Sequence, residues 1–365
     1  MSGPSKTLEE ARWTLDFRLR AAMERRPIAA MLELTRRCPL RCAHCYLGDQ
    51  AAQHRLRDRE LDTTAVQSAI SEWAAAGCLY VTITGGDPMI RPDFAEIYRH
   101  AREQGLVVTV FCSGVLVTDE RVDLFRELPP RKVEISLYGA TAETHDAVTG
   151  VPGSHALAWA GIRRLKAAGV RLVIKTLILS TNRHEFEALE RQAVETGAGF
   201  RFDAAIFPCL HDGSRAPLAL RMPPEEVVRI DMEDSCRRAM WRDKIEQMAA
   251  HPDDDRLYPC AAGLNQFHAD PFGGLTPCLM ATAFRDGGVD RPFRERWERG
   301  LGAIREARRT GTGGSFGGEM RGACTHCPAF NRLETGSEEI ESEYMQRTTR
   351  LRYEAAMSGS DGEET

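Results

Sequence analysis

The sequence lacks any apolar run that approaches the roughly 20 residues needed to cross a membrane. Residues 1–24 are charged and contain no apolar core of the kind found in a secretory signal. We therefore expect no membrane partner and a cytoplasmic protein. The net charge of −5 also excludes the basic footprint of a nucleic-acid-binding protein. Local arginine clusters at 18–26 and 305–309 are typical of solvated helix faces.

A disulfide framework is not expected either, because thiols stay reduced in the cytoplasm. The chain nevertheless has 11 cysteines, and seven of them fall into two groups with the spacing of metal ligands. Its 365 residues, 42% apolar and 28% charged, are ordinary for a globular protein and exceed what one compact domain usually needs. A large domain with an appendage is the expected organisation.

Residues 29–207 alternate short β-rich runs with amphipathic helical patterns. The predicted strands are Ala30–Leu34, Leu79–Thr84, Val107–Phe111, Lys132–Leu137, Arg171–Leu179 and Phe200–Phe207. The predicted helices are Thr63–Ala76, Asp93–Gln104, Asp119–Leu128, His155–Ala168 and His184–Thr196, four of them closed by Gly77, Gly105, Gly169 and Gly197. Such alternation indicates an α/β fold with a parallel sheet. Six units favour a partial (β/α)6 TIM-like barrel, with an open doubly wound sheet as the alternative that periodicity does not exclude.

The remainder of the chain divides by composition. Glu225–Ala250 has the pattern of one long polar helix, and Glu338–Ala356 that of a charged helix. Between them, the Gly-, Pro- and Cys-rich stretch 258–330 indicates a small module stabilised by a bound metal. The predicted segments are an N-terminal helical extension (1–28), the barrel (29–222), a linking helix (223–257), a Cys-rich module (258–335), and a C-terminal helix with a disordered tail from Ser358 to Thr365 (336–365).

The first cysteine group, Cys38, Cys42 and Cys45, directly follows the first predicted strand. Ligands bind at the carboxyl ends of strands in such folds. Three thiolates at these spacings can hold three corners of a [4Fe-4S] cluster and leave one iron open. S-adenosylmethionine (SAM) can chelate that iron, and an electron from the cluster then cleaves it to a deoxyadenosyl radical. The alternative is a zinc site with His44 as fourth ligand, but a histidine adjacent to Cys45 has poor geometry for sharing one ion.

This motif, C-x3-C-x2-C after a first barrel strand, resembles that of the radical SAM superfamily, and the resemblance covers Ala29 to about Phe207. It implies that His44 lies near the adenine of SAM. The turn formed by Gly85, Gly86, Asp87 and Pro88 resembles the family's Gly-Gly-Glu-Pro turn, which holds the SAM ammonium group. This sequence departs from the pattern in having aspartate where glutamate is commoner.

The resemblance implies further cofactor contacts on later strands. Ser113 lies in an altered form of the family's Thr-Asn-Gly turn, and Ser136 corresponds to a serine near the SAM ribose and methionine. Lys175 is a candidate partner for the SAM carboxylate, with a surface lysine as the alternative. Asp203 on the sixth strand is the carboxylate expected to face the cavity, and we name it as a catalytic candidate. Cys209 follows at the barrel mouth, and its role stays open.

The second cysteine group consists of Cys260, Cys278, Cys324 and Cys327. With Gly273, its spacing resembles the SPASM/twitch modules found behind peptide-modifying radical SAM enzymes. Four thiolates suffice for one fully ligated auxiliary [4Fe-4S] cluster. They would also make a closed zinc site, and spacing alone does not decide between the two.

The resulting hypothesis is a radical SAM enzyme that abstracts hydrogen from a ribosomally synthesised peptide, for crosslinking, epimerisation or a related change. Its expected partners are a precursor peptide, an external flavodoxin- or ferredoxin-type electron donor and a separate leader-binding protein, because only about thirty residues precede the barrel. One alternative is an oxidoreductase acting on a small molecule such as a sugar, nucleotide or cofactor precursor. Another is a non-catalytic iron–sulfur or zinc protein, which would have no use for the Gly85–Pro88 turn.

Overall fold

The computed structural model describes residues 4–250, 255–311, 319–324 and 327–358. Its main sheet has the strand order β6-β5-β4-β3-β2-β1-β7-β8. The strands are β1 (Ala29–Thr35), β2 (Tyr80–Gly85), β3 (Val107–Cys112), β4 (Lys132–Ser136), β5 (Leu172–Leu177), β6 (Gly199–Asp203), β7 (Gln266–Ala269) and β8 (Leu275–Thr276). β1 to β6 are parallel neighbours in chain order. A doubly wound sheet would reverse its order at a switch point, so the predicted partial barrel is confirmed.

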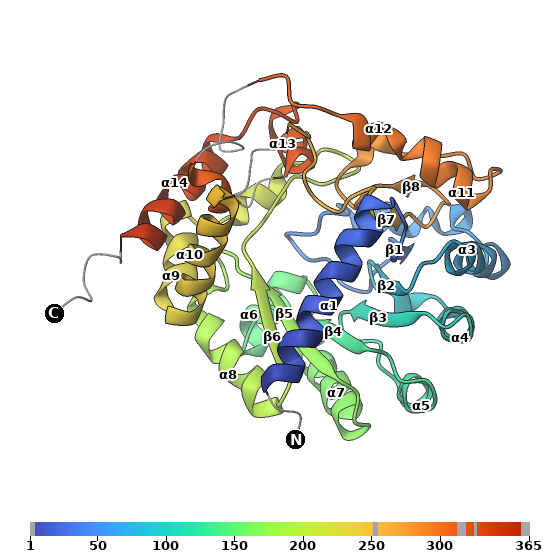
Figure 1. Cartoon of the computed structure of the whole chain (residues 1–365). Helices are drawn as coiled ribbons and strands as arrows, with labels where there is room; N and C mark the ends of the chain where they lie inside the picture. Colours follow the sequence, from blue (N-terminus) through green and yellow to red (C-terminus); the bar gives the residue numbers. More distant parts are fainter. Residues whose placement is uncertain (1–3, 251–254, 312–318, 325–326, 359–365) are drawn as a thin grey trace.

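Helices cover the outer face of this sheet (Figure 1). The five predicted helices are present as α3 (Thr63–Ala75), α4 (Phe94–Glu103), α5 (Asp119–Glu127), α7 (Ser154–Ala167) and α8 (Phe186–Thr196). The structure adds a helix that was not predicted, α6 (Ala142–Thr149), in which Thr141 accepts a hydrogen bond from the Thr144 amide and Gly150 closes the end with φ of 67°. β6 is shorter than predicted and ends at Asp203, whose Oδ1 accepts from the Ala205 amide at 2.8 Å.

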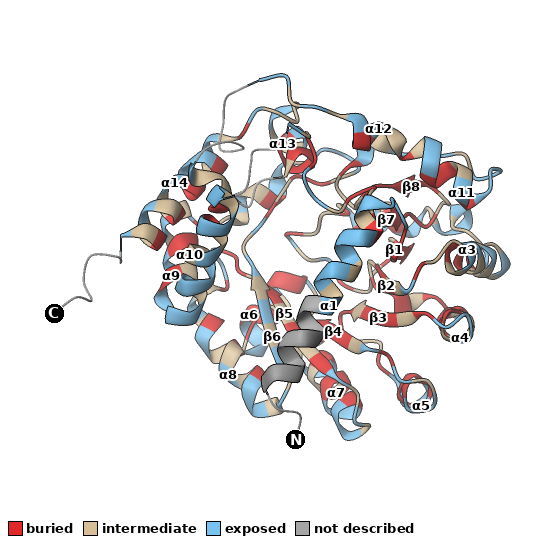
Figure 2. Cartoon of the chain, in the orientation of Figure 1, coloured by how far each residue is buried: buried red, intermediate tan, exposed pale blue. Residues whose placement is uncertain are grey.

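The barrel core forms because each strand alternates its side chains between two faces. In β1, Ala30, Leu32 and Leu34 point outward into the buried layer beneath the helices, where Phe94 and Tyr98 of α4 are fully buried. Figure 2 shows this buried layer between strands and helices. The other face of the strands is left for the barrel interior, where the polar side chains lie.

The C-terminal part extends the barrel sheet, which the sequence analysis did not predict. β7 pairs in parallel with β1, and β8 returns antiparallel to β7. In the turn between them, Asp270 Oδ1 accepts hydrogen bonds from the amides of Phe272 and Gly274, and Gly273 adopts φ of 84°. The glycine of the second cysteine pattern therefore closes a hairpin. Short helices follow at α11 (Phe293–Glu295), α12 (Gly302–Glu306) and α13 (Pro328–Thr335).

The prediction of one helix over Glu225–Ala250 is wrong. The structure has α9 (Pro224–Glu233) and α10 (Ser235–Ala250), because Asp234 is extended and its side chain accepts from the Arg237 amide at 2.8 Å. The C-terminal helix α14 (Glu343–Met357) begins later than predicted, capped by Ser342, and packs on α9 and α10. Of the predicted disordered tail, residues 359–365 lie outside the described residues.

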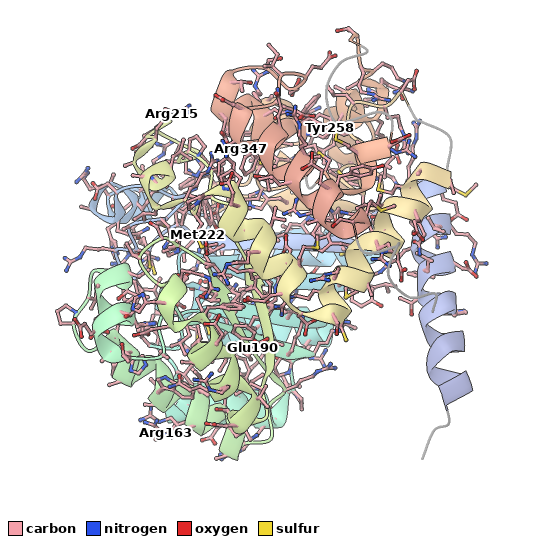
Figure 3. The ribbon with its side chains drawn as sticks, turned by 90° about the vertical axis from the view of Figure 1, so that its left-hand side faces the viewer. Arg163, Glu190, Arg215, Met222, Tyr258 and Arg347 are labelled. Carbon is pink, nitrogen blue, oxygen red and sulfur yellow. The ribbon has the colours of Figure 1, made fainter. Side chains whose placement is uncertain are left out.

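Two helices remain, α1 (Pro4–Met23), which runs along one side of the molecule (Figure 3), and α2 (Gln50–His54) after the first cysteine group. None of the helices described here combines the length and the apolar character that crossing a membrane would take.

Candidate active site

A cavity of about 910 Å³ lies inside the barrel and continues to the C-terminal helices. Its walls include residues of the first cysteine loop, of β1 to β6, of α9, α10 and α14, and of the second cysteine group. Eleven predicted site residues line it, namely Cys38, Cys42, His44, Cys45, Gly85, Gly86, Ser113, Ser136, Lys175, Asp203 and Cys327. The remaining predicted residues, Asp87, Pro88, Cys260, Cys278 and Cys324, do not.

The three thiols of the first group share one buried environment. Burial raises the pKa of Cys38, Cys42 and Cys45 above the ordinary value of a thiol, and the neighbouring cysteines raise that of Cys38 and Cys42 further. A metal centre deprotonates such thiols by supplying the missing positive charge, so this donor set fits an iron–sulfur cluster. In the described part of the chain, no three His, Cys, Asp or Glu side chains are already arranged to hold a metal ion. Cluster ligation therefore stays a prediction of the motif.

Two side chains hold the cysteine loop from α2. The buried Gln50 accepts a hydrogen bond from the Cys38 amide at 2.9 Å, and its Nε2 lies 4.0 Å from Cys45 Sγ. His54 Nε2 lies 3.1 Å from the Cys38 carbonyl oxygen. The sequence analysis missed Gln50, since a glutamine after a cysteine motif carries no signal of its own. Its contacts position both ends of the loop that carries the thiols.

The Gly85–Pro88 turn packs directly against the backbone that leads into the cysteine loop. The Gly86 amide donates to the Thr35 carbonyl at 2.8 Å, and the Asp87 amide donates to the Arg37 carbonyl at 2.9 Å. A Cβ on Gly85 would lie 2.0 Å from the Thr35 oxygen, and one on Gly86 would lie 2.3 Å from the Arg37 oxygen. The two glycines thus allow the turn to pack closely against the backbone before the cysteine loop, and they also line the cavity.

Asp87 is fully buried and supports the neighbouring turn. Its Oδ1 accepts from the Met89 amide at 3.0 Å, and its Oδ2 accepts from the Ser113 amide at 3.0 Å and from the Ser113 hydroxyl. Burial raises the pKa of this carboxyl, while these hydrogen bonds oppose the rise. Ser113, and not Asp87, lines the cavity. The predicted contact of Asp87 with the SAM ammonium stays a prediction, and its visible role is to hold Ser113.

Replacing Asp87 with alanine is expected to weaken SAM binding about tenfold, because about 1–2 kcal/mol of hydrogen bonding to Ser113 is lost. Iron content should stay at the wild-type level. Equilibrium dialysis of SAM against the reconstituted protein measures the affinity. Ser113→Ala is the matched control and should show a smaller loss, since the Ser113 amide keeps its acceptor. An unchanged affinity in Asp87→Ala would remove Asp87 from the site.

His44 and Tyr138 form an aromatic corner of the cavity. Their rings meet edge to face with centroids 4.5 Å apart. Burial lowers the pKa of His44 to about 4, so the imidazole is neutral near pH 7. Its Nδ1 is buried without a hydrogen-bond partner among the described residues. A buried ring nitrogen of this kind is suited to a ligand hydrogen bond, and a flat aromatic surface is suited to a purine.

Lys175 lies in the barrel interior, which excludes the surface lysine that was its alternative. Its Nζ lies 3.6 Å from the centre of the Phe111 ring. Burial lowers its pKa to about 8, and the carboxylate of Glu134 opposes this change. Glu134 is itself buried and pairs with Lys132 at 2.6 Å and with Arg201 at 3.2 Å. Since three cations share one carboxylate here, an additional anion such as the SAM carboxylate would be favoured.

Asp203 and Cys209 lie at the mouth of the barrel. Asp203 is exposed at the end of β6 and lines the cavity, as expected, while its catalytic role stays a prediction. Cys209 Sγ lies 3.4 Å from the Cys45 carbonyl oxygen, and the Leu210 amide donates to the Tyr46 carbonyl at 2.9 Å. This segment therefore packs on the cysteine loop and closes it from outside.

The second cysteine group gathers three thiols on one side. Burial raises the pKa of Cys327 to about 12, with further contributions from Cys278 and Cys260. Cys260 likewise raises the pKa of Cys278, after burial. Cys324 lies beside α10, since its charge acts on Lys244. As donors, these three neighbouring thiols suit an iron–sulfur cluster or zinc, and their chemistry does not discriminate between the two.

Comparison with known proteins identifies the family. Residues 32–193 match the sequence model of the family described as "Radical SAM superfamily". The chain is also 33% identical over 291 residues to the PqqA peptide cyclase of Ruegeria pomeroyi, covering 75% of this chain and 74% of that protein. The chain belongs to the radical SAM superfamily. It is 27% identical over 299 residues to the AdoMet-dependent heme synthase of Methanosarcina barkeri, covering 76% and 84%.

Solved radical SAM structures share the fold. Streptococcus suis SuiB bound to precursor peptide SuiA aligns with a TM-score of 0.67 at 14% identity, over 95% of this chain and 82% of SuiB. AnSMEcpe with bound AdoMet and the Kp18Cys peptide aligns with a TM-score of 0.61 at 12% identity, over 91% and 96%. Membership confirms that the protein is a radical SAM enzyme, whose family uses a [4Fe-4S] cluster and SAM, and the non-catalytic alternative is wrong.

Proposed function

We propose that this radical SAM enzyme modifies a ribosomally synthesised peptide by removing a hydrogen atom from one of its residues. The observation that carries this proposal is the continuous cavity, which joins the first cysteine loop to Cys327 and to α10 and α14. A volume of about 910 Å³ is at the upper end of the usual range for ligand pockets. It suits SAM together with a segment of a larger substrate. The PqqA peptide cyclases among the relatives support a peptide.

Each part of the cavity has a task in this proposal. Cys38, Cys42 and Cys45 would hold the cluster that, with SAM, supplies a deoxyadenosyl radical. His44 and Tyr138 would bind the adenine through the buried Nδ1 and the ring face. Lys175 would neutralise the SAM carboxylate inside the barrel, and Asp203 at the mouth would accept a substrate proton. The walls would limit the access of water to the reacting carbon.

The second cysteine group, Cys260, Cys278, Cys324 and Cys327, would hold one auxiliary [4Fe-4S] cluster, which could accept an electron from the substrate. An external flavodoxin- or ferredoxin-type donor and a separate leader-binding protein complete the proposal. Cys327 supports the electron-accepting role, because it lines the same cavity as the first group.

Anaerobically reconstituted protein is expected to bind about eight irons per chain, as two four-iron clusters require. The Cys278→Ala/Cys327→Ala variant should bind about four and still cleave SAM, because both residues lie outside the first loop. Iron and zinc are measured by elemental analysis, and cleavage by 5′-deoxyadenosine formation. About four irons plus one zinc in the wild type would contradict the auxiliary cluster.

The peptide substrate is tested with synthetic peptides that match any short reading frames found beside the gene. Incubated with enzyme, SAM and a reductant, one of them should be modified: a crosslink lowers its mass by two hydrogens, and an epimerisation changes its chromatographic retention at unchanged mass. If none changes while a small molecule does, the second candidate holds. That candidate, an oxidoreductase for a small molecule, is favoured by the similarity to the AdoMet-dependent heme synthase.

A further inference from the structure

We propose that the cavity wall formed by α10 binds a carboxylate group of the substrate through Lys244, with Arg237 on the same helix as a second donor. This inference rests on the proposed function, since it names a chemical feature of the substrate that enters the same cavity. It adds that the segment bound next to the second cysteine group is acidic.

The charges that line the cavity are unbalanced. Five basic side chains contribute to its walls, and only two acidic ones do. The basic residues are Lys175, Arg201, Arg237, Lys244 and Arg352, and the acidic residues are Asp203 and Asp231. A cleft lined mainly by one sign of charge concentrates ligands of the opposite sign.

Two of the basic residues already pair with a carboxylate of the protein. Arg352 pairs with Asp231 through Nε at 2.9 Å and Nη2 at 2.8 Å, and its Nη1 donates to the Ala323 carbonyl at 3.1 Å. Arg201 pairs with Glu134 at 3.2 Å, in the interior region that also contains Lys175. These groups have little capacity left for a substrate anion at the far end of the cavity.

Lys244 differs from them. Its Nζ lies 4.5 Å from the centre of the Trp241 ring, and no carboxylate of the described residues lies within 4.0 Å of it. Arg352 lies over the same ring at 4.4 Å. Burial and the Arg352 charge lower the pKa of Lys244, while Cys324 and Asp231 oppose this change. Among the described residues, Lys244 therefore lacks a carboxylate counter-ion at ion-pair distance. An incoming carboxylate would supply that counter-ion.

Arg237 lies about two helical turns before Lys244 on α10 and is also incompletely paired. Its Nε donates to the Ile230 carbonyl at 3.2 Å, and its nearest carboxylate, Glu190, lies 3.9 Å from Nη1. The guanidinium lies over Phe202 at 5.4 Å. Both cations thus stand on aromatic rings within the cavity wall. A substrate that fits this wall has a carboxylate next to an apolar side chain.

The competing explanation is that Lys244 only balances the charge of the Cys324 thiolate, which raises the pKa of Lys244. That explanation predicts a change in the second metal site and no preference among substrates. The experiment must therefore report on both.

The test uses a library of end-blocked hexapeptides in which one position carries glutamate or glutamine and the others vary. The library is passed over immobilised, reconstituted wild type, Lys244→Gln or Lys166→Gln. Mass spectrometry then gives the ratio of glutamate to glutamine peptides in the bound fraction. Lys166 is the matched control, because it lies on α7 and contacts the Thr196 carbonyl. Glutarate is used as a small competitor. Thermal unfolding and metal content show whether each variant is folded, and Lys244→Arg tests rescue by charge.

Wild type and Lys166→Gln are expected to enrich glutamate peptides at least about tenfold, the value of one charge-assisted hydrogen bond. Lys244→Gln should reduce the ratio to within about twofold of unity, and Lys244→Arg should restore part of it. The proposal would be overturned if wild type showed neither enrichment nor Lys244-dependent glutarate binding, or if Lys244→Gln showed the same enrichment as wild type. Glutarate binding that depends on Lys244 without peptide enrichment would support the carboxylate site and contradict the peptide substrate.

Discussion

Replacing Cys38, Cys42 and Cys45 together with alanine is expected to lower reductive SAM cleavage by at least about a thousandfold, a loss of roughly 4 kcal/mol or more in transition-state stabilisation. The three thiols line one cavity and share one buried environment, so their removal deletes the whole donor set. Iron should fall from about eight to about four per chain. The measurement is 5′-deoxyadenosine formed per minute with dithionite as reductant.

The matched control removes cysteines that take no part in the site. Cys78 is buried in the core and Cys236 is exposed, so the double alanine variant should retain both the iron and the rate. If the triple variant still formed 5′-deoxyadenosine at the wild-type rate, the catalytic assignment of the first cysteine group would be wrong.

Replacing Gly86 with alanine is expected to be nearly as damaging. The added Cβ would lie 2.3 Å from the Arg37 carbonyl oxygen and 2.6 Å from that of Arg36. These are backbone atoms and cannot rotate away, so the cysteine loop or the Gly85–Pro88 turn must shift. Since a shift of about 1 Å at a catalytic site can cost roughly a hundredfold in rate, we expect at least that loss in SAM cleavage, with reduced iron at the first site.

Gly302 provides the control for this substitution. It lies at the start of α12, and a Cβ there would meet no atom within 4 Å. Gly302→Ala should therefore leave iron content and SAM cleavage unchanged and stabilise the helix slightly, because alanine favours helix more than glycine does. Wild-type iron and activity in Gly86→Ala would show that the loop accommodates the extra atom and that the close packing is dispensable.

The barrel could be predicted because its signals are local. Strands such as Val107–Cys112 are runs of β-branched and apolar residues, and Gly77, Gly105, Gly169 and Gly197 all adopt the positive φ expected at helix ends. The break between α9 and α10 was also readable, since Asp234 before Ser235 is a helix-capping signal. The overall polar character of the segment instead predicted one continuous helix.

Other features depend on contacts between distant segments and have no local signal. β7 is four residues long and gains its stability by pairing with β1 across more than two hundred residues of chain. Gln50 acquires its role only when α2 folds back on the cysteine loop. Trp241 and Lys244 reach the cavity because α10 lies over the barrel mouth. For Asp87, the motif predicted a ligand contact, whereas the structure shows a buried acceptor for Ser113.

Hydrogen transfer from a peptide to the deoxyadenosyl radical formed from SAM is the central claim, and deuterium labelling tests it most directly. A candidate peptide, deuterated at its carbon-bound positions, is incubated with reconstituted enzyme, SAM and reductant, and the 5′-deoxyadenosine is analysed by mass spectrometry. The account predicts that deuterium from the peptide appears in 5′-deoxyadenosine and that the peptide changes mass in the same reaction. Unlabelled 5′-deoxyadenosine accompanying a modified peptide would contradict it.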